Sequence, residues 1–189
     1  MKTIIYFMRH GEVYNPKRIL YGRMSGFRLS EYGRESVKLQ AENLKKRKIN
    51  FIYASPMLRT RQSAKILSEE LGIKVKISSF LNEVKLIFEG MPLMEYKSKI
   101  QPSLYENKYY LKGQESVESI AERMTKFLKM IEKRHNGQET LVVSHGDPIV
   151  ILKAEINNIP FTWKYKKDNY LKTATFTTLE IKDGRYNWK

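Results

Sequence analysis

Cysteine is absent from the 189 residues of this chain. Disulfide bonds, thiolate zinc sites and cysteine nucleophiles are therefore excluded, whatever the compartment. The sequence also contains no G-x-x-x-x-G-K-[ST] loop, no G-x-G-x-x-G turn and no H-E-x-x-H pair. Nucleotide-driven and zinc-dependent chemistry are thus unsupported, and we expect no cofactor and no metal.

Long hydrophobic runs are missing as well. The apolar run IIYFM covers only residues 4–8 and is followed at once by charged and polar residues. It is too short for the apolar region of a signal peptide or for a membrane span. We therefore expect a soluble, cytoplasmic protein without a membrane partner.

Negative charge is scarce compared with positive charge. The 35 lysines and arginines oppose 20 aspartates and glutamates, which gives a formal net charge of +15. Such a field attracts phosphates, nucleic acid and anionic surfaces. The basic run KKRK at 45–48 lies at the end of a predicted helix, and we interpret it as a solvated end favoured by the helix dipole. His135 follows a later predicted helix, and we interpret it as another such end group.

Two stretches rich in tyrosine and lysine, at 96–112 and 163–170, offer the kind of surface on which single-stranded nucleic acid stacks. No recognised nucleic-acid-binding fold accompanies them. We therefore expect no specific nucleic-acid partner. A non-catalytic module that binds anions or nucleic acid is the alternative to an enzyme.

The length and the hydrophobic content of 41% suit one globular domain over residues 1–189. Three apolar runs, at 4–8, 51–55 and 141–144, lack the period-two alternation of half-exposed strands, which indicates strands buried on both faces. Helical patterns lie between them. These features predict an α/β fold, a three-layer α/β/α sandwich with a mostly parallel central sheet. An Asp-Gly turn at 183–184 predicts a terminal hairpin.

Residue types mark several helix ends. Ser55 is predicted as the N-cap of a helix in which Pro56 is the first residue and Gly72 lies just beyond the end. An apolar stripe predicts another helix over about 116–133. A last helix is predicted to start with Asp147 as its cap.

The segment at about 84–112 has no clean hydrophobic period and is too long for an ordinary connection. Two interpretations stay open. The segment is either an insertion over the active site or a helical excursion packed elsewhere.

Polar side chains gather directly behind the three predicted strands. Arg9 and His10 follow the first strand, Arg59 lies in the helical turn after the second, and His145 follows the third. Open α/β sheets bind ligands beyond the carboxyl ends of their strands. Two of the three histidines in the chain are therefore expected on one rim together with two arginines.

These residue types suit phosphate chemistry. Arginine binds phosphate oxygens through a planar pair of hydrogen bonds, and neutral imidazole attacks phosphorus as a nucleophile. A single histidine at a strand end is more often a structural residue. The coincidence at three strand ends favours a phosphate site that needs no metal.

The stretch RHGE at 9–12 resembles the signature of the histidine phosphatase superfamily, the phosphoglycerate mutase-like proteins. Three later stretches resemble further blocks of that family in the same order: SPMLRTRQSA at 55–64, GQESVESIAERM at 113–124 and VSHGDPI at 143–149. Four ordered blocks are far more specific than a lone RHG.

The resemblance implies roles for six residues. His10 is the nucleophile that becomes phosphohistidine, and Glu83 is the acid that protonates the leaving oxygen and later deprotonates water. The phosphate pocket is formed by Arg9, Arg59 and His145, with a further hydrogen bond from Asn15. Arg18 and Arg23 straddle the position of an additional family arginine, and the sequence does not decide which of them faces the substrate.

We therefore predict a metal-independent phosphomonoesterase that acts on a small phosphorylated substrate. A phosphoglycerate mutase-type phosphotransferase is the alternative enzyme. Because family mutases are generally longer, the short chain favours hydrolysis. The sequence sets neither the natural substrate nor the oligomeric state.

Overall fold

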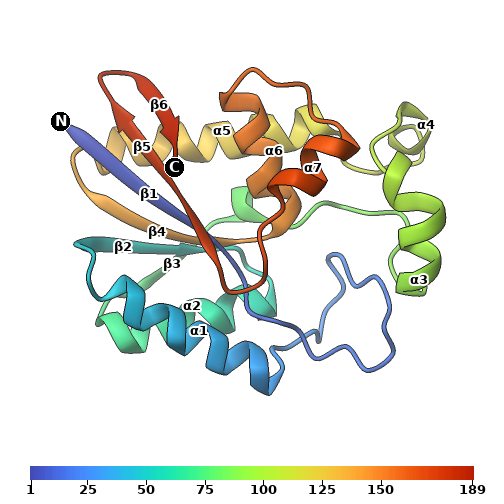
Figure 1. Cartoon of the computed structure of the whole chain (residues 1–189), viewed down its shortest axis with the longest axis horizontal. Helices are drawn as coiled ribbons and strands as arrows, with labels where there is room; N and C mark the ends of the chain where they lie inside the picture. Colours follow the sequence, from blue (N-terminus) through green and yellow to red (C-terminus); the bar gives the residue numbers. More distant parts are fainter.

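A six-stranded mixed sheet forms the centre of the molecule (Figure 1). The computed structural model describes all 189 residues, and the strands are ordered β3-β2-β4-β1-β5-β6 across the sheet. The first four strands of this order are parallel, whereas β5 and β6 are antiparallel to their neighbours. The strand bounds are Lys2–Arg9 for β1, Ile49–Ala54 for β2, Val75–Ile77 for β3, Glu139–Ser144 for β4, Phe176–Lys182 for β5 and Arg185–Trp188 for β6.

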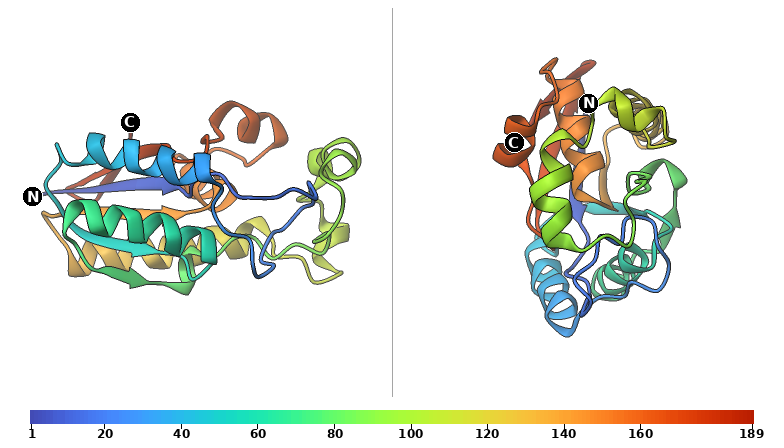
Figure 2. Two further views of the ribbon diagram at one scale, coloured as in Figure 1. Left: turned by 90° about the horizontal axis from the view of Figure 1, so that it is seen from below. Right: turned by 90° about the vertical axis from the view of Figure 1, so that its right-hand side faces the viewer.

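Helices cover both faces of this sheet (Figure 2). Alternate residues of β1 pack into the hydrophobic cores on the two faces of the sheet. Tyr6 and Met8 pack with residues of α1 and α2 on one face, and Ile5 and Phe7 pack with residues of α5 and α6 on the other. The prediction of a three-layer α/β/α sandwich with a mostly parallel sheet is confirmed. The bounds of the covering helices are Glu31–Leu44 for α1, Leu58–Leu71 for α2, Val117–Arg134 for α5 and Gly146–Ile156 for α6.

The predicted terminal hairpin is present. Strands β5 and β6 pair antiparallel with Lys182 opposite Arg185. Asp183 and Gly184 between them have φ angles of 52° and 71°, a backbone conformation that suits an Asp-Gly turn.

Some helix ends follow the predicted punctuation and others do not. Gly72 ends α2 in the left-handed conformation, and the Ser116 side chain caps α5 by accepting from the Ser119 amide. Helix α2, however, begins at Leu58 after Met57, so the prediction of Ser55 as its N-cap is wrong. The Ser55 hydroxyl instead bonds His145, which directly follows the neighbouring strand β4.

The start of α6 is a second correction. The helix begins at Gly146 with His145 as the capping residue, so Asp147 lies inside the first turn and is not the cap. Its carboxylate is bound by Lys166 and Tyr105. A buried ammonium offers this carboxylate a stronger partner than backbone amides.

The basic ends of two helices differ in burial. Residues 45–48 are exposed after α1, as predicted. His135 is also at a helix end, but it is only 6% exposed, stacks on Phe51 and bonds the Tyr53 hydroxyl at 2.9 Å. The interpretation of His135 as a solvated end group is wrong, because two aromatic residues of β2 enclose it.

The segment 84–112 folds into short helical turns beyond the carboxyl ends of the strands (Figure 2, left). The isolated bridge between Ile19 and Pro92 joins it to the loop that follows β1. Two backbone bonds, Leu20 N to Met91 O and Leu93 N to Arg18 O, both at 2.8 Å, tighten this junction. Its helical pieces are α3 (Leu93–Glu95), a π turn (Tyr96–Ile100), a 3-10 turn (Gln101–Ser103) and α4 (Asn107–Tyr110).

None of the helices is both long enough and apolar enough to cross a lipid bilayer.

Candidate active site

Three neighbouring strand ends assemble the candidate site. In the sheet, Arg9 of β1 lies opposite Ser144 of β4, and Ala54 of β2 lies opposite Val143 of β4. The next residue of each strand continues this register, so His10 N donates to Ser144 O at 3.1 Å. The two imidazole rings that follow β1 and β4 consequently lie with their centroids 5.2 Å apart.

The hydrogen bonds of His10 set its tautomer. Nδ1 lies 2.7 Å from the carbonyl oxygen of Gly11, and since a carbonyl only accepts, Nδ1 carries the proton. Nε2 accepts a hydrogen bond from the Arg59 Nε–H at 3.1 Å, so it presents a lone pair. The ring is therefore fixed in the form in which Nε2 can act as a nucleophile.

The surroundings of His10 keep it neutral. Its side chain is buried, and residue exposure is 1%. Burial lowers the pKa of His10 well below its usual value, and the cations of Arg59 and Arg9 lower it further. A neutral, oriented imidazole is therefore present across the physiological pH range.

Arg59 connects the members of the site. It stands in the first turn of α2 and is 1% exposed. Its Nη2 donates to Gly22 O at 2.9 Å and lies 3.1 Å from His145 Nδ1, while its Nε bonds His10. The guanidinium stacks over the Tyr21 ring at 4.8 Å. One fixed cation thus bridges both histidines.

His145 is held from two sides. Because Arg59 can only donate, His145 Nδ1 accepts and Nε2 carries the proton, which it gives to Ser55 Oγ at 2.9 Å. Burial, followed by the Arg59 cation, lowers the pKa of His145 well below its usual value. Ser55 is therefore a site residue that the sequence suggested only as a helix cap.

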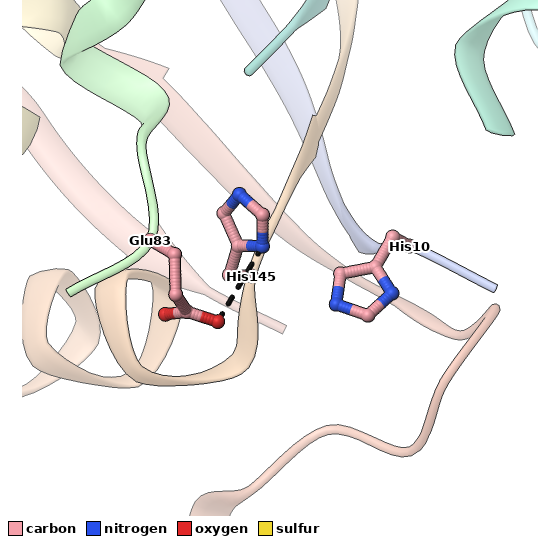
Figure 3. Close-up of side chains that lie close together, drawn as sticks. All are labelled: His10, Glu83 and His145. Carbon is pink, nitrogen blue, oxygen red and sulfur yellow. Dashed lines mark ion pairs between the residues drawn. The ribbon is translucent and has the colours of Figure 1, made fainter. Parts of the chain in front are cut away.

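Glu83 reaches the histidines from the loop after the 3-10 turn Ser79–Leu81. Figure 3 shows its carboxylate pointing at His145, with Oε2 3.4 Å from His145 Nδ1. The same oxygen lies 3.6 Å from Arg59 Nη2. Burial raises the pKa of the Glu83 carboxyl. The Arg59 cation lowers this pKa, whereas the Asp147 carboxylate raises it further. A raised pKa favours a protonated carboxyl that can serve as a general acid.

Arg9 adds a second cation, which is half-buried. Its Nη1 donates to Leu171 O at 2.8 Å, and its guanidinium lies over the Tyr170 ring at 4.8 Å. Its Nε is buried without a hydrogen-bond partner. A buried donor of this kind is costly unless a ligand satisfies it.

A cavity of 370 Å³ opens beside these groups. Arg9, Glu83 and Asp147 line it together with Leu93 and Tyr96 from the segment 84–112. This segment therefore borders the cavity directly. Leu20 and Tyr21 of the loop after β1 complete the wall.

Asn15 is placed differently from the other predicted site residues. Its amide spans the loop after β1, where Nδ2 donates to Ile19 O at 2.8 Å and Oδ1 accepts from Ile19 N at 3.2 Å. Arg18 is exposed, whereas Arg23 Nε donates to the Glu83 carbonyl at 2.6 Å. The structure thus brings together Arg9, His10, Arg59, Glu83 and His145, and it assigns Asn15 to loop closure.

Two glycines permit the close packing around the histidines. A Cβ on Gly11 would lie 2.6 Å from Gly33 O and 2.9 Å from Val37 Cγ2 of α1. A Cβ on Gly146 would overlap the Tyr170 ring. Both turns therefore require glycine for space and not for a positive φ angle.

Asp147 and Lys166 form a buried ion pair next to the cavity, and sequence reasoning missed it. Lys166 Nζ lies 2.7 Å from Asp147 Oδ2, and the Tyr105 hydroxyl donates to the same oxygen. Burial favours the neutral carboxyl, but Lys166 and Tyr105 hold the pKa of Asp147 below its usual value. No local signal links these residues, since they lie on α6, α7 (Trp163–Asn169) and the 84–112 segment.

The arrangement is better suited to an anion than to a metal. One ligand atom from each of His10, Glu83 and His145 lies within 4.8 Å of the others, a spacing that a metal ion can use. Both ring lone pairs, however, already accept from Arg59. A guanidinium keeps its charge in proteins, so the centre of the cluster is positive and matches phosphate.

Comparison with known proteins agrees with this chemistry. Phosphoserine phosphatase 1 of Hydrogenobacter thermophilus is 27% identical over 193 residues, which cover 96% of this chain and 88% of that protein. Phosphoglycerate mutase-like protein 4 of Arabidopsis thaliana is 31% identical over 156 residues, covering 77% and 67% of the two chains. The solved structure of a mycobacterial glucosyl-3-phosphoglycerate phosphatase shares the fold, with a TM-score of 0.84 at 20% identity over 98% of this chain and 96% of that one.

A family model described as the histidine phosphatase superfamily (branch 1) matches residues 5–189. The match includes all three strand ends that carry the site. The chain belongs to the histidine phosphatase superfamily.

Proposed function

We propose that this protein is a metal-independent phosphomonoesterase that works through a phosphohistidine at His10. Membership of the superfamily supports a phosphatase or mutase-type enzyme. The observation that carries the finer proposal is the fixed tautomer of His10, whose Nε2 lone pair points at the Arg59 cation. A phosphate bound by that cation places its phosphorus next to the nucleophile.

The first step transfers the phosphoryl group to the protein. The bound phosphate takes over the Arg59 Nε–H, which frees the Nε2 lone pair of His10. This lone pair forms a bond to phosphorus while the bond from phosphorus to the ester oxygen breaks. Protonated Glu83 gives its proton to the departing oxygen, which leaves as an alcohol. Arg9 and Arg59 donate to the phosphoryl oxygens and stabilise their charge in the transition state. His145 supports this pocket by accepting from Arg59 and so fixing the guanidinium.

The second step releases phosphate. Glu83, now a carboxylate, takes a proton from water while the water oxygen bonds to phosphorus. The bond from phosphorus to Nε2 breaks, and its electron pair returns to the imidazole. Glu83 is protonated again and His10 is neutral, so the cycle closes.

The cations of the site support a reaction without a divalent metal. The buried Arg59 and the half-buried Arg9 supply the positive field that Mg²⁺ provides in other phosphoryl-transfer enzymes. Inorganic phosphate and vanadate are expected to compete with substrate for the same donors.

A panel of phosphate esters, assayed with EDTA present, tests the proposal. The panel includes sugar phosphates, nucleotide-derived phosphates, an α-ribazole phosphate-like cobamide precursor and phosphoproteins. Phosphoserine is added because a relative is named for it. We expect release of inorganic phosphate that EDTA leaves unchanged and that His10→Ala abolishes.

A strict requirement for Mg²⁺ would contradict the proposed mechanism. Transfer to an added alcohol in place of water would instead indicate the phosphotransferase. Binding of phosphate without turnover of any ester would favour a non-catalytic module.

A further inference from the structure

Glu115 is the centre of a charged cluster that lies against the loop carrying Glu83. It stands just before α5, and its side chain is 12% exposed. Arg23 Nη2 donates to Oε2 at 2.8 Å, and Arg123 Nε donates to Oε1 at 2.7 Å. The cluster joins the loop after β1, the start of α5 and α5 itself.

Both arginines also bind backbone carbonyls, one of Glu83 itself and one of the turn before it. Arg23 Nε donates to the carbonyl of Glu83 at 2.6 Å, and Arg123 Nη1 donates to the carbonyl of Phe80 at 2.5 Å. A single carboxylate thus orients two cations whose remaining donors hold the loop.

Glu115 holds the same loop directly as well. Its Oε2 accepts from the Lys85 amide at 3.2 Å, and its own amide donates to the Lys85 carbonyl at 3.0 Å. The backbone is therefore fixed before, at and after Glu83. No other carboxylate in the chain receives two arginines.

The side chain of Glu83 depends on this backbone for its position. Its own hydrogen bond is local, from the Val84 amide to Oε1 at 3.0 Å. Oε2 lies 3.4 Å from His145 and 3.6 Å from Arg59, which are longer contacts. The carboxyl is thus aimed mainly by the loop that carries it.

We propose that Glu115, acting through Arg23 and Arg123, is the positioning residue that holds the Glu83 carboxyl at the leaving oxygen. The inference rests on the proposed function of Glu83 as the general acid. Glu115 itself touches neither substrate nor the reacting atoms.

The expected effect follows from geometry. Displacement of a catalytic group by about 1 Å costs on the order of 10²-fold in rate. Replacing Glu115 with Gln removes the charge that holds both arginines but keeps the size of the side chain. The loss is confined to reactions that need the proton of Glu83.

The test compares two esters in single-turnover phosphorylation of His10. An alkyl phosphate expels a strongly basic alkoxide and needs the acid, whereas 4-nitrophenyl phosphate expels a stable phenolate. Glu115→Gln is expected to slow the alkyl ester roughly 10- to 100-fold and the nitrophenyl ester less than about 3-fold. Vanadate affinity, which reports the phosphate pocket, is expected to stay within about 3-fold.

A double-mutant cycle with Glu83→Gln separates positioning from a general loss of structure. If Glu115 acts through Glu83, then Glu115→Gln costs little once Glu83 is already Gln. Arg23→Gln, which removes the bond to the Glu83 carbonyl, is expected to reproduce the same ester dependence and serves as the second variant if Glu115→Gln does not fold.

Glu180 supplies a matched control. It also receives two cations, Lys2 at 3.3 Å and Lys189 at 2.7 Å, and its side chain is 18% exposed. It lies on β5, outside the site. Glu180→Gln is expected to change neither ester by more than about 2-fold.

Equal losses on the two esters, or an undiminished loss in the Glu83→Gln background, would overturn the role of Glu115 while leaving the proposed function intact. The proposed function fails separately if Glu83→Gln itself shows no ester dependence or if no phosphoenzyme forms. In that case the positioning role is also rejected.

Discussion

Arg59→Lys keeps the positive charge of the site but removes the planar fork. In the structure Arg59 contacts His10 through Nε at 3.1 Å and His145 through Nη2 at 3.1 Å, while Nη2 also binds Gly22 O. A lysine ammonium is a point charge and cannot occupy both nitrogen positions. The variant therefore tests whether the geometry of Arg59, and not merely its charge, is needed.

The magnitude follows from the lost hydrogen bonds. A hydrogen bond to a charged group contributes about 1.5–3 kcal/mol. Losing between one and two such bonds to the transition state costs roughly 2–4 kcal/mol, which corresponds to a loss of about 30- to 900-fold in rate. Because lysine retains the charge, the ground-state affinity for inorganic phosphate falls less than the rate.

The assay is single-turnover phosphorylation, with vanadate binding measured in parallel. Arg61→Lys is the matched control, since Arg61 lies on the same helix but is exposed, and we expect it to change the rate less than about 2-fold. Thermal unfolding of both variants checks that the fold is kept. An Arg59→Lys rate within 3-fold of the parent would refute the argument that the fork bridges both histidines for catalysis.

Three further predictions concern pH, stability and nucleic acid. The pKa of Glu83 is raised and its acid form is needed, so kcat/KM for an alkyl phosphate should fall as pH rises through that pKa. Glu83→Gln should remove this alkaline limb. The neutral His10 should impose no acidic limb until well below pH 6.5. Lys166→Met leaves the charge of the buried Asp147 carboxylate unpaired and should lower the free energy of unfolding by about 3–5 kcal/mol in denaturant titrations. Adding Asp147→Asn should restore most of the lost free energy of unfolding. The charge of +15 should give only non-specific binding to a labelled oligonucleotide, with anisotropy lost as salt rises; a sequence-selective complex at physiological salt would contradict this.

The main architecture was predictable because it depends on local patterns. The runs that became β1, β2 and β4 are apolar on both faces, and this pattern is typical of strands covered by helices on both sides. Once parallel strands were placed side by side, the residues just behind them had to share one edge. His10 and His145 could therefore be paired from sequence.

Features that depend on distant partners were not predictable. Ser55 and Asp147 have side chains that commonly cap helices, but each finds a stronger tertiary partner, His145 for Ser55 and Lys166 for Asp147. Arg23 and Glu115 are separated by 92 positions in the chain. No local pattern signals such a contact, so the cluster behind Glu83 emerges only in three dimensions.

The central claim is that His10 carries the phosphoryl group, and trapping the phosphoenzyme tests it most directly. The protein is mixed with a ³²P-labelled ester, quenched without acid and mapped by mass spectrometry. We expect an acid-labile, base-stable phosphoryl group on His10 that forms at the rate of alcohol release and is absent from His10→Ala. The same phosphohistidine trapped in His10→Ala, or turnover of the parent with water attacking the ester directly and no phosphoenzyme, would contradict it.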